Sequence, residues 1–206
     1  LGTSYGTRIG AIYADLFPGR VGRAVLDGAM DPSQHWADDE AETTAFKEDV
    51  LRQYVEHCKA HSGCPLTGST DEALAQLAAF VDGLDQDPLT APDSNVTVNA
   101  FEATTIIRHY AIDKPDWEAL TAMLTPAMNN HDGALMVKAK QSVLALQLPT
   151  NIKQAVSRAN NLFMAAAVIC NDYPDTGSTT SDWDAQSAAE KKSHPFFGGT
   201  SNGLEA

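Results

Sequence analysis

The sequence predicts an α/β segment followed by a mainly α-helical region, on three observations. Small turn residues at the start of the chain give way to an amphipathic helix that ends at Pro18-Gly19. A short apolar run, residues 23–28, follows this helix and is typical of a buried strand. From about residue 36 to residue 170, apolar residues recur at helical spacing. Turn, helix and strand together make an α/β unit, and the helical region follows it.

The composition favours a globular domain and excludes several classes of protein. A chain of 206 residues is long enough to bury a core. It carries 27 acidic and 14 basic residues, a net charge of −13, and such a surface repels phosphate backbones and anionic lipid. We therefore expect no nucleic-acid partner and no membrane partner. With 43% hydrophobic residues the chain is not a disordered acidic tail, and no apolar run approaches the roughly 18 residues of a membrane span.

Each predicted helix carries one apolar stripe. In the first helix the stripe is Ile9, Ile12, Tyr13, Leu16 and Phe17. In the helical region the stripes are Phe46, Val50, Leu51, Tyr54, Val55 and Cys58; then Leu74, Leu77, Ala78, Val81 and Leu84; then Trp117, Leu120, Met123, Leu124, Ala127 and Met128. Lys114-Pro115-Asp116 favours a helix start before the last stripe. Weaker patterns predict helices at 134–146 and 152–169, a loop at 85–98 and a polar surface tail at 174–206.

The segment Gly2-Thr3-Ser4-Tyr5-Gly6 matches G-x-S-x-G, the nucleophile elbow, in which a serine sits on a strained strand-to-helix turn. Gly2 and Gly6 would relieve crowding around that turn. The positive end of the following helix and the amide of Tyr5 could stabilise an oxyanion. The pattern makes Ser4 the candidate nucleophile and Tyr5 the candidate backbone oxyanion donor. The alternative is a Gly-Ser turn that happens to precede a helix.

Three motifs fill most of the first 32 residues, at 2–10, 17–21 and 25–32. Together they resemble the tripeptidyl aminopeptidase branch of the secreted α/β-hydrolases, which belong with the prolyl-aminopeptidase-like serine peptidases. The resemblance continues more loosely through Cys58…Cys64-Pro65-Leu66, residues 117–120 and residues 168–172. It implies that Ser4 is the nucleophile. It also implies an α/β-hydrolase fragment at 1–33 with the elbow and one core strand, a mainly helical lid at 34–173, and a tail at 174–206 leading back toward a missing core.

The sequence offers no clear candidate for the other two members of a catalytic triad, the acid and the histidine. In the resembling family the acid and the histidine come later in the chain, so we expect an internal fragment that is inactive alone. Five histidines lie in or beside the predicted lid helices: His35, His57, His61, His109 and His131. The sixth, His194 in the tail, is the one best placed to fold back toward Ser4. Asp31 follows the predicted strand, but Asp31-Pro32 is more simply a turn, as is Asp27-Gly28.

The three cysteines point to one disulfide. Cys58 and Cys64 are separated by a helix end and a turn that could bring the two thiols together. The alternatives are one buried and one exposed free thiol, or a zinc site with His57 or His61, which lacks enough obvious ligands. The resemblance implies that the partner of Cys170 lies beyond the end of the chain. Disulfides would imply export, so we expect a secreted or cell-envelope protein.

Two further features bear on function. An acidic cluster at the start of the helical region could hold the α-ammonium group of an aminopeptidase substrate, or could be a solvated helix face; it comprises Asp38, Asp39, Glu40, Glu42, Glu48 and Asp49. Asn95-Val96-Thr97 is an N-glycosylation sequon, which only a eukaryotic secretory host would use.

The resemblance implies an exopeptidase that releases short peptides from free N-termini through an acyl-enzyme, with no metal or other cofactor. One alternative is a carboxylester hydrolase on the same fold. The other is an inactive helical lid or interaction module, which could self-associate through surfaces that truncation leaves uncovered.

Overall fold

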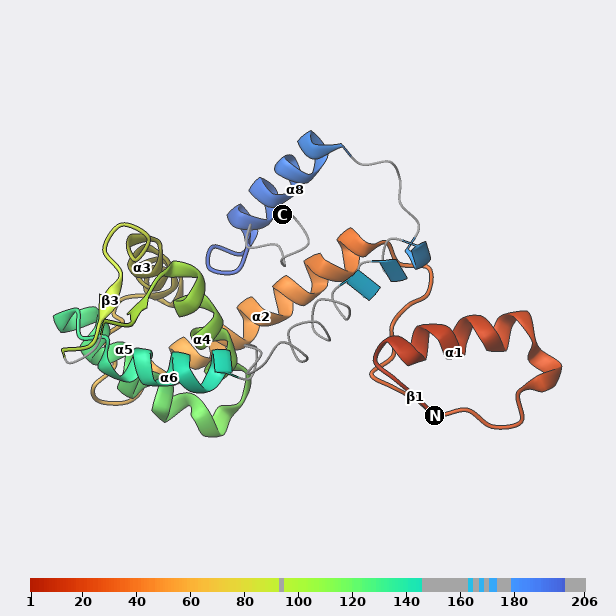
Figure 1. Ribbon diagram of the computed structural model, residues 1–206, viewed down its shortest axis with the longest axis horizontal. Coiled ribbons are helices and arrows are strands. Elements are labelled where there is room, and N and C mark those ends of the chain that lie inside the picture. Colours follow the sequence, from red (N-terminus) through yellow and green to blue (C-terminus); the bar gives the residue numbers. More distant parts are fainter. Residues whose placement is uncertain (93–94, 146–162, 165–166, 169–170, 174–178, 199–206) are drawn as a thin grey trace.

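The computed structural model describes residues 1–92, 95–145, 163–164, 167–168, 171–173 and 179–198. A small α/β unit lies at one end of the molecule and a body of helices at the other (Figure 1). Within the described residues, no helix combines the length and the apolar character needed to cross a bilayer.

The α/β unit consists of two short parallel strands joined by a helix. Its elements are β1 (Gly2–Thr3), α1 (Tyr5–Leu16), the 3-10 helix η1 (Pro18–Arg20) and β2 (Leu26–Asp27). Gly2 pairs with Leu26 and Thr3 with Asp27, in parallel register. A parallel pair needs a crossover connection, and α1 supplies it. The α/β fold class predicted from the sequence is therefore present.

The predicted burial of residues 23–28 is wrong. Val25 is 63% exposed and Leu26 39% exposed, and the apolar stripe of α1 also faces outward. The exposed stripe residues of α1 are Ile9, Ile12, Tyr13, Leu16 and Phe17. The physical reason is that a strand pair and one helix need a further layer to cover them, and the described residues supply none over this face.

Among the described residues, five helices build the helical body: α2 (Trp36–Lys59), α3 (Thr70–Gly83), α4 (Ala100–Ile112), α5 (Trp117–Asn130) and α6 (Ala134–Ala145). The 3-10 helix η2 (Lys114–Asp116) leads into α5. The helices predicted from the three strong stripes and from residues 134–146 are confirmed. The predicted helix at 152–169 falls largely outside the described residues. Ser69 with Glu72, and Asn99 with Glu102, form capping boxes that begin α3 and α4.

The core of the helical body forms where the apolar stripes meet. Its fully buried side chains include Leu51, Tyr54, Leu74, Leu77, Ile106, Ile107, Leu120 and Leu124. The prediction for Phe46 is wrong, because this side chain is 58% exposed. Phe46 lies on the face of α2 that carries the exposed Glu42 and Asp49, whereas Thr44, Glu48 and Leu51 lie on the buried face.

Two predicted irregular segments contain regular structure. The predicted loop at 85–98 includes β3 (Leu89–Thr90) and β4 (Thr97–Val98), which pair antiparallel and bury Leu89 and Val98. The predicted tail includes α8 (Thr180–Ser193), which Thr179 and Asp182 begin with a capping box. Phe196 and Phe197 follow α8 and are each 4% exposed, so this part of the tail joins the core rather than the surface.

Candidate active site

Ser4 occupies the turn between β1 and α1. Its backbone has φ 55° and ψ −126°, a conformation that is uncommon for a residue with a side chain. A backbone hydrogen bond joins this turn to the end of β2, since the Ser4 N–H donates to the Asp27 carbonyl at 3.1 Å. Ser4 itself is exposed. The backbone therefore has the strand–turn–helix form that the G-x-S-x-G motif requires. We call residues 2–6 the elbow.

The two glycines of the elbow differ in what surrounds them. A Cβ on Gly2 would lie 2.5 Å from the Gly6 carbonyl oxygen, closer than real contacts allow. A Cβ on Gly6 would meet nothing within 4 Å among the described atoms. Close backbone approach thus explains Gly2 and does not explain Gly6.

The N-terminus of α1 is aimed at the turn. Tyr5 is the first residue of α1, so its backbone N–H has no acceptor within the helix. The same helix end carries partial positive charge, and no acidic side chain lies in the first turn to offset it. This arrangement can stabilise an anion beside Ser4.

Thr7 ties the first turn of α1 to the loop after β2. Its side chain is fully buried, and its hydroxyl donates to the Ser4 carbonyl at 2.7 Å. The same oxygen accepts a hydrogen bond of 2.9 Å from the Met30 N–H. One side chain therefore joins the first turn of α1 to the loop after β2.

Arg8 is the largest fully buried side chain of the α/β unit. It is 2% exposed. Its guanidinium donates to the Asp31 carbonyl at 3.0 Å and to the Asp172 carbonyl at 3.1 Å. It also lies 4.1 Å from the centre of the Tyr173 ring, a cation–π distance. One arginine thus joins α1, the loop after β2 and residues 171–173.

Tyr5 reaches the same segment from the elbow itself. Its hydroxyl donates to Asp172 Oδ2. Burial, followed by this bond to a carboxylate, raises the pKa of Tyr5 to about 12. The bond from the Tyr5 hydroxyl, followed by one from Asn171, lowers the pKa of the Asp172 carboxyl. The tyrosine therefore stays protonated and the aspartate ionised at neutral pH.

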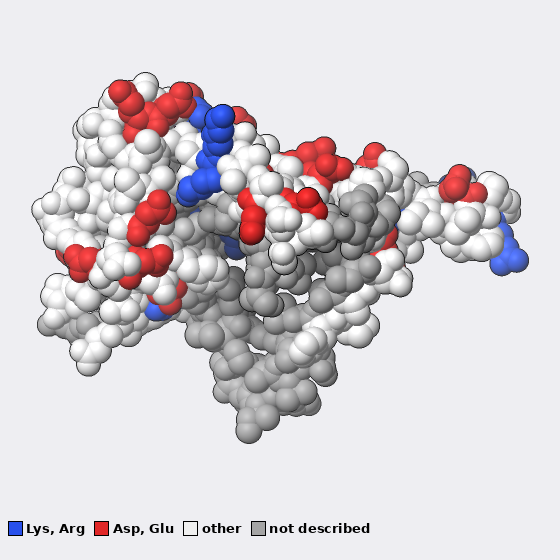
Figure 2. Space-filling view, turned by 90° about the horizontal axis from the view of Figure 1, so that it is seen from above, with Lys and Arg blue, Asp and Glu red and all other residues white. Residues whose placement is uncertain are grey.

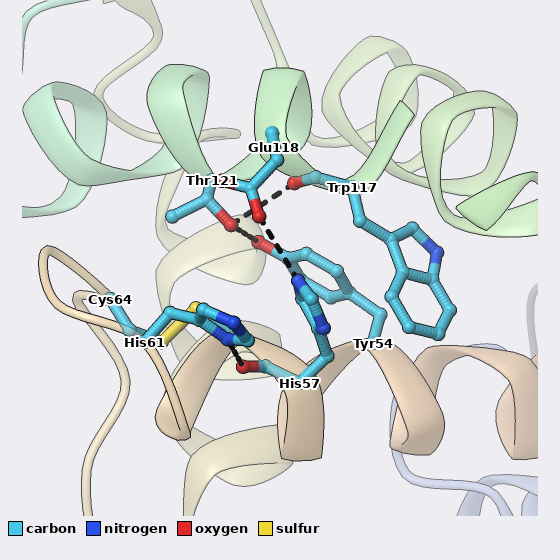
Figure 3. A network of polar contacts seen from close by, with 8 residues as sticks. Tyr54, His57, His61, Cys64, Trp117, Glu118 and Thr121 are labelled. Carbon is cyan, nitrogen blue, oxygen red and sulfur yellow. Dashed lines mark hydrogen bonds and ion pairs between the residues drawn. A yellow bond between two sulfur atoms is a disulfide. The ribbon is translucent and has the colours of Figure 1, made fainter. Parts of the chain in front are cut away.

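The histidines lie on or beside helices other than α1. His57 contacts Glu118 at 3.1 Å, and its carbonyl accepts from His61 at 2.7 Å (Figure 3). In the same group Tyr54 and Thr121 form a hydroxyl pair at 3.1 Å. The other four histidines are likewise on or beside helices: His35 precedes α2, the ring of His109 makes an edge contact with Tyr110, His131 ends α5 and lies 3.6 Å from Asp87, and His194 ends α8.

His194 does not reach Ser4. It ends α8, and the segment directly after it packs on α2, whereas α1 lies at the far end of the molecule (Figure 1). Among the described residues, the hydrogen bonds of Ser4 join it only to Asp27 and Thr7. No described histidine is therefore bonded to the candidate nucleophile.

The two candidate acids, Asp27 at the end of β2 and Asp31 in the loop after it, have structural roles. The carboxylate of Asp31 accepts from the hydroxyl and the N–H of Ser33, and these bonds lower the pKa of Asp31. The carbonyl of Asp27 accepts the hydrogen bond from the Ser4 N–H. Asp27 thus stabilises the elbow through its carbonyl, and Asp31 stabilises the loop after β2.

The acidic cluster of α2 serves more than one purpose. Acidic side chains outnumber basic ones over the face drawn in Figure 2. Asp38, Glu42 and Asp49 are exposed, as a solvated helix face requires. Glu48 is 2% exposed and accepts from the N–H groups of Phe196 and Phe197. Burial, then the nearby Glu42, raises the pKa of Asp39.

The predicted disulfide is confirmed, because Cys58 and Cys64 are bonded across a Cα–Cα distance of 5.3 Å. Cys170 lies outside the described residues. Within the residues that the structure describes, no group of three or more His, Cys, Asp or Glu side chains could hold a metal ion.

The sequence reasoning missed Thr7, Arg8 and Asp172. Arg8 carried a signal, since an arginine in the first turns of a helix opposes the positive helix end unless it has another purpose. Asp172 carried none, because its partner Tyr5 lies 167 residues away.

A serine on a strained turn within a parallel βαβ unit defines the class of the protein, the α/β-hydrolases. The model of the alpha/beta hydrolase fold family matches residues 1–134, and the chain belongs to this family. The resemblance noted above is thereby confirmed at the level of the fold family.

Curated relatives are similar over part of their length. Serine protease Hip1 of Mycobacterium tuberculosis and that of Mycobacterium bovis are 38% identical over 94 residues, which are 46% of this chain and 17% of either relative. The putative hydrolase YuaR of Escherichia coli is 19% identical over 179 residues, 84% of this chain and 32% of the relative. The chain thus spans less than a third of the length of these relatives.

Proposed function

We propose that this chain carries the nucleophile of a serine peptidase, with Ser4 as that nucleophile. The observation that carries the proposal is the exposed Ser4 at φ 55° between β1 and α1, in front of a helix N-terminus. Similarity to a protein named serine protease Hip1 supports a peptidase over other hydrolases of this fold.

In the proposed reaction Ser4 Oγ attacks the scissile carbonyl of a peptide. Its proton passes to a general base, a role for which the described contacts of Ser4 supply no residue. The Tyr5 N–H donates to the oxyanion that forms, and the positive end of α1 adds to its stabilisation. The base returns its proton to the leaving nitrogen, so the tetrahedral intermediate collapses to an acyl-enzyme and a free amine. Water then attacks the acyl-enzyme, releases the acid and restores the Ser4 hydroxyl.

The substrate in this proposal is a peptide with a free N-terminus, from which a short peptide is released. The resemblance to tripeptidyl aminopeptidases suggests this class. The net charge of −13 and the carboxylate of Asp39 suit a cationic peptide end. In this proposal the region at 34–173 serves as the lid, and α2 begins beside the α/β unit, where Trp36 packs on Tyr173.

The same proposal places the protein outside the cytoplasm, as a secreted or cell-envelope enzyme. The Cys58–Cys64 disulfide supports an oxidising compartment. In this proposal the reaction involves no nucleic acid, membrane or cofactor. The exposed apolar stripe of α1 is a surface through which the protein could self-associate.

Hydrolysis assays on the native protein that contains this chain test the proposal. The substrates are a tripeptidyl chromogenic amide, the same amide with an acetylated N-terminus, and an acyl ester. We expect turnover of the free-amine amide, a loss of at least tenfold on acetylation, and no turnover by Ser4→Ala. Ser62→Ala, an exposed serine within the disulfide loop, is the matched control and should equal wild type.

Other outcomes favour other functions. Turnover of the ester without the amide would identify a carboxylester hydrolase. Amide turnover that survives Ser4→Ala would remove Ser4 from the reaction. Absence of any hydrolysis by the native protein would favour a helical interaction module.

A further inference from the structure

We propose that Asp172 is a positioning residue: with Arg8 it fixes Tyr5, and so the oxyanion-donating end of α1, against residues 171–173. The inference rests on the proposed function, because it assigns the Tyr5 N–H to the oxyanion. Asp172 touches neither Ser4 nor the reacting atoms in this account and acts through Tyr5.

The first observation is that both oxygens of the Asp172 carboxylate are engaged. Oδ2 accepts from the Tyr5 hydroxyl, and Oδ1 accepts from the Asn171 side-chain amide at 2.9 Å. Charge-assisted hydrogen bonds of this kind are stronger and more directional than neutral ones. The Tyr5 side chain is therefore held in one orientation.

The second observation is that Arg8 holds the backbone of the same residue. Its Nη2 donates to the Asp172 carbonyl, and its Nη1 donates to the Asp31 carbonyl in the loop after β2. The guanidinium packs on Tyr173, whose ring makes an edge contact with Trp36 at a centroid distance of 5.2 Å. Asp172 is thus fixed to α1 through its main chain and through its side chain.

The third observation is the strain at the neighbouring residue. Ser4 has a positive φ, and a strained backbone persists only where its surroundings determine it fully. The Tyr5 N–H belongs to the peptide group between Ser4 and Tyr5. A change in the backbone angles of Tyr5 would therefore change the direction in which this N–H points. A misplacement of about 1 Å in a catalytic group can cost about a hundredfold in rate.

A positioning role and a purely structural role predict different kinetics. If the Tyr5–Asp172 bond aligns the oxyanion donor, its loss lowers kcat and leaves KM unchanged, because the donor acts on the transition state. If the bond only stabilises the fold, its loss lowers the unfolding temperature and leaves kcat of the folded enzyme unchanged.

The experiment measures kcat, KM and unfolding temperature for five forms of the native protein: wild type, Tyr5→Phe, Asp172→Ala, the double variant and Asp172→Asn. We expect Tyr5→Phe and Asp172→Ala each to lower kcat about tenfold with KM unchanged. The double variant should lose no more than either single one, since both remove the same bond. Asp172→Asn keeps an acceptor oxygen and should recover most of the rate.

Two matched controls lie on the same helix. Tyr13→Phe removes an exposed hydroxyl and Asp15→Asn an exposed carboxylate, and both should keep the wild-type kcat. If Asp172→Ala does not fold, Tyr5→Phe and Asp172→Asn still decide the question.

The inference is overturned if Tyr5→Phe and Asp172→Ala keep the wild-type kcat, or if their losses multiply in the double variant. This result is distinct from failure of the proposed function. In that second case the wild type itself shows no Ser4-dependent turnover, and both proposals fall together.

Discussion

Glu48 of α2 accepts a hydrogen bond of 3.0 Å from the N–H of Phe197, a residue 149 positions later in the chain. A second bond, at 3.3 Å, comes from the N–H of Phe196. Glu48 is 2% exposed, so its carboxylate satisfies two N–H groups that water does not reach. The segment after α8 is therefore fastened to the middle of α2.

Replacing Glu48 by alanine should destabilise the protein by about 2–4 kcal/mol, because two buried N–H groups lose their acceptor. Urea unfolding followed by circular dichroism measures the change. Glu48→Gln keeps one acceptor oxygen and should cost less. The neighbouring Asp49 is exposed, so Asp49→Ala should have a free energy of unfolding within about 0.5 kcal/mol of wild type. Equal effects at positions 48 and 49 would contradict the buried bond.

Replacing Thr7 by valine should cost about 1–2 kcal/mol of stability, because the side chain keeps its shape and loses the bonds to Ser4 and Met30. Thr7→Ser retains the hydroxyl and should lose less stability than Thr7→Val. The same unfolding measurement compares the two variants. A serine variant as unstable as the valine variant would show that packing at position 7, rather than its hydroxyl, is what counts.

The two elbow glycines should respond differently to alanine. At Gly2 a Cβ would clash with the Gly6 carbonyl, so Gly2→Ala should cost about 1–3 kcal/mol. At Gly6 the space is open, and alanine, the better helix former, should leave stability unchanged or raise it by up to about 1 kcal/mol. Thermal unfolding of both variants decides. A larger loss at Gly6 than at Gly2 would refute this geometry.

The capping box of α3 should make stability depend on pH. The Ser69 N–H, followed by the Ser69 hydroxyl, holds the pKa of Glu72 below its usual 4.5. The ionised form therefore stabilises the folded state above pH 4.5, and this contribution disappears as pH falls through the lower folded pKa. We expect the unfolding temperatures of wild type and Glu72→Gln to differ at pH 7 and to converge by about pH 3. Glu56→Gln, an exposed residue of α2, is the control, and a gap that stays constant with pH would argue against the cap.

The sequence predicts those parts of the fold that local pattern determines. The stripes of α2, α3 and α5 recur at helical spacing, and all three helices are present. Cys58 and Cys64 are six positions apart, so one helix end could bring them together. The elbow motif likewise contains its own turn, and Ser4 adopts the positive φ that the motif needs.

The missed features depend on what lies opposite a residue rather than on its own pattern. Val25 and Leu26 are as apolar as a buried strand, but periodicity does not say whether another layer covers them. The bond between Tyr5 and Asp172 joins residues 167 positions apart, which no local pattern records. In contrast, Thr179 and Asp182 had the spacing of a helix cap, and α8 could have been predicted from it.

Covalent labelling of Ser4 tests the central claim most directly. The native protein containing this chain is treated with a fluorophosphonate, which reacts with activated serines, and the adduct is located by mass spectrometry of its peptides. We predict an adduct on Ser4, inhibition in proportion to labelling, and loss of both in Ser4→Ala. An adduct on another serine, or labelling that Ser4→Ala leaves unchanged, would contradict the assignment of Ser4 as the nucleophile.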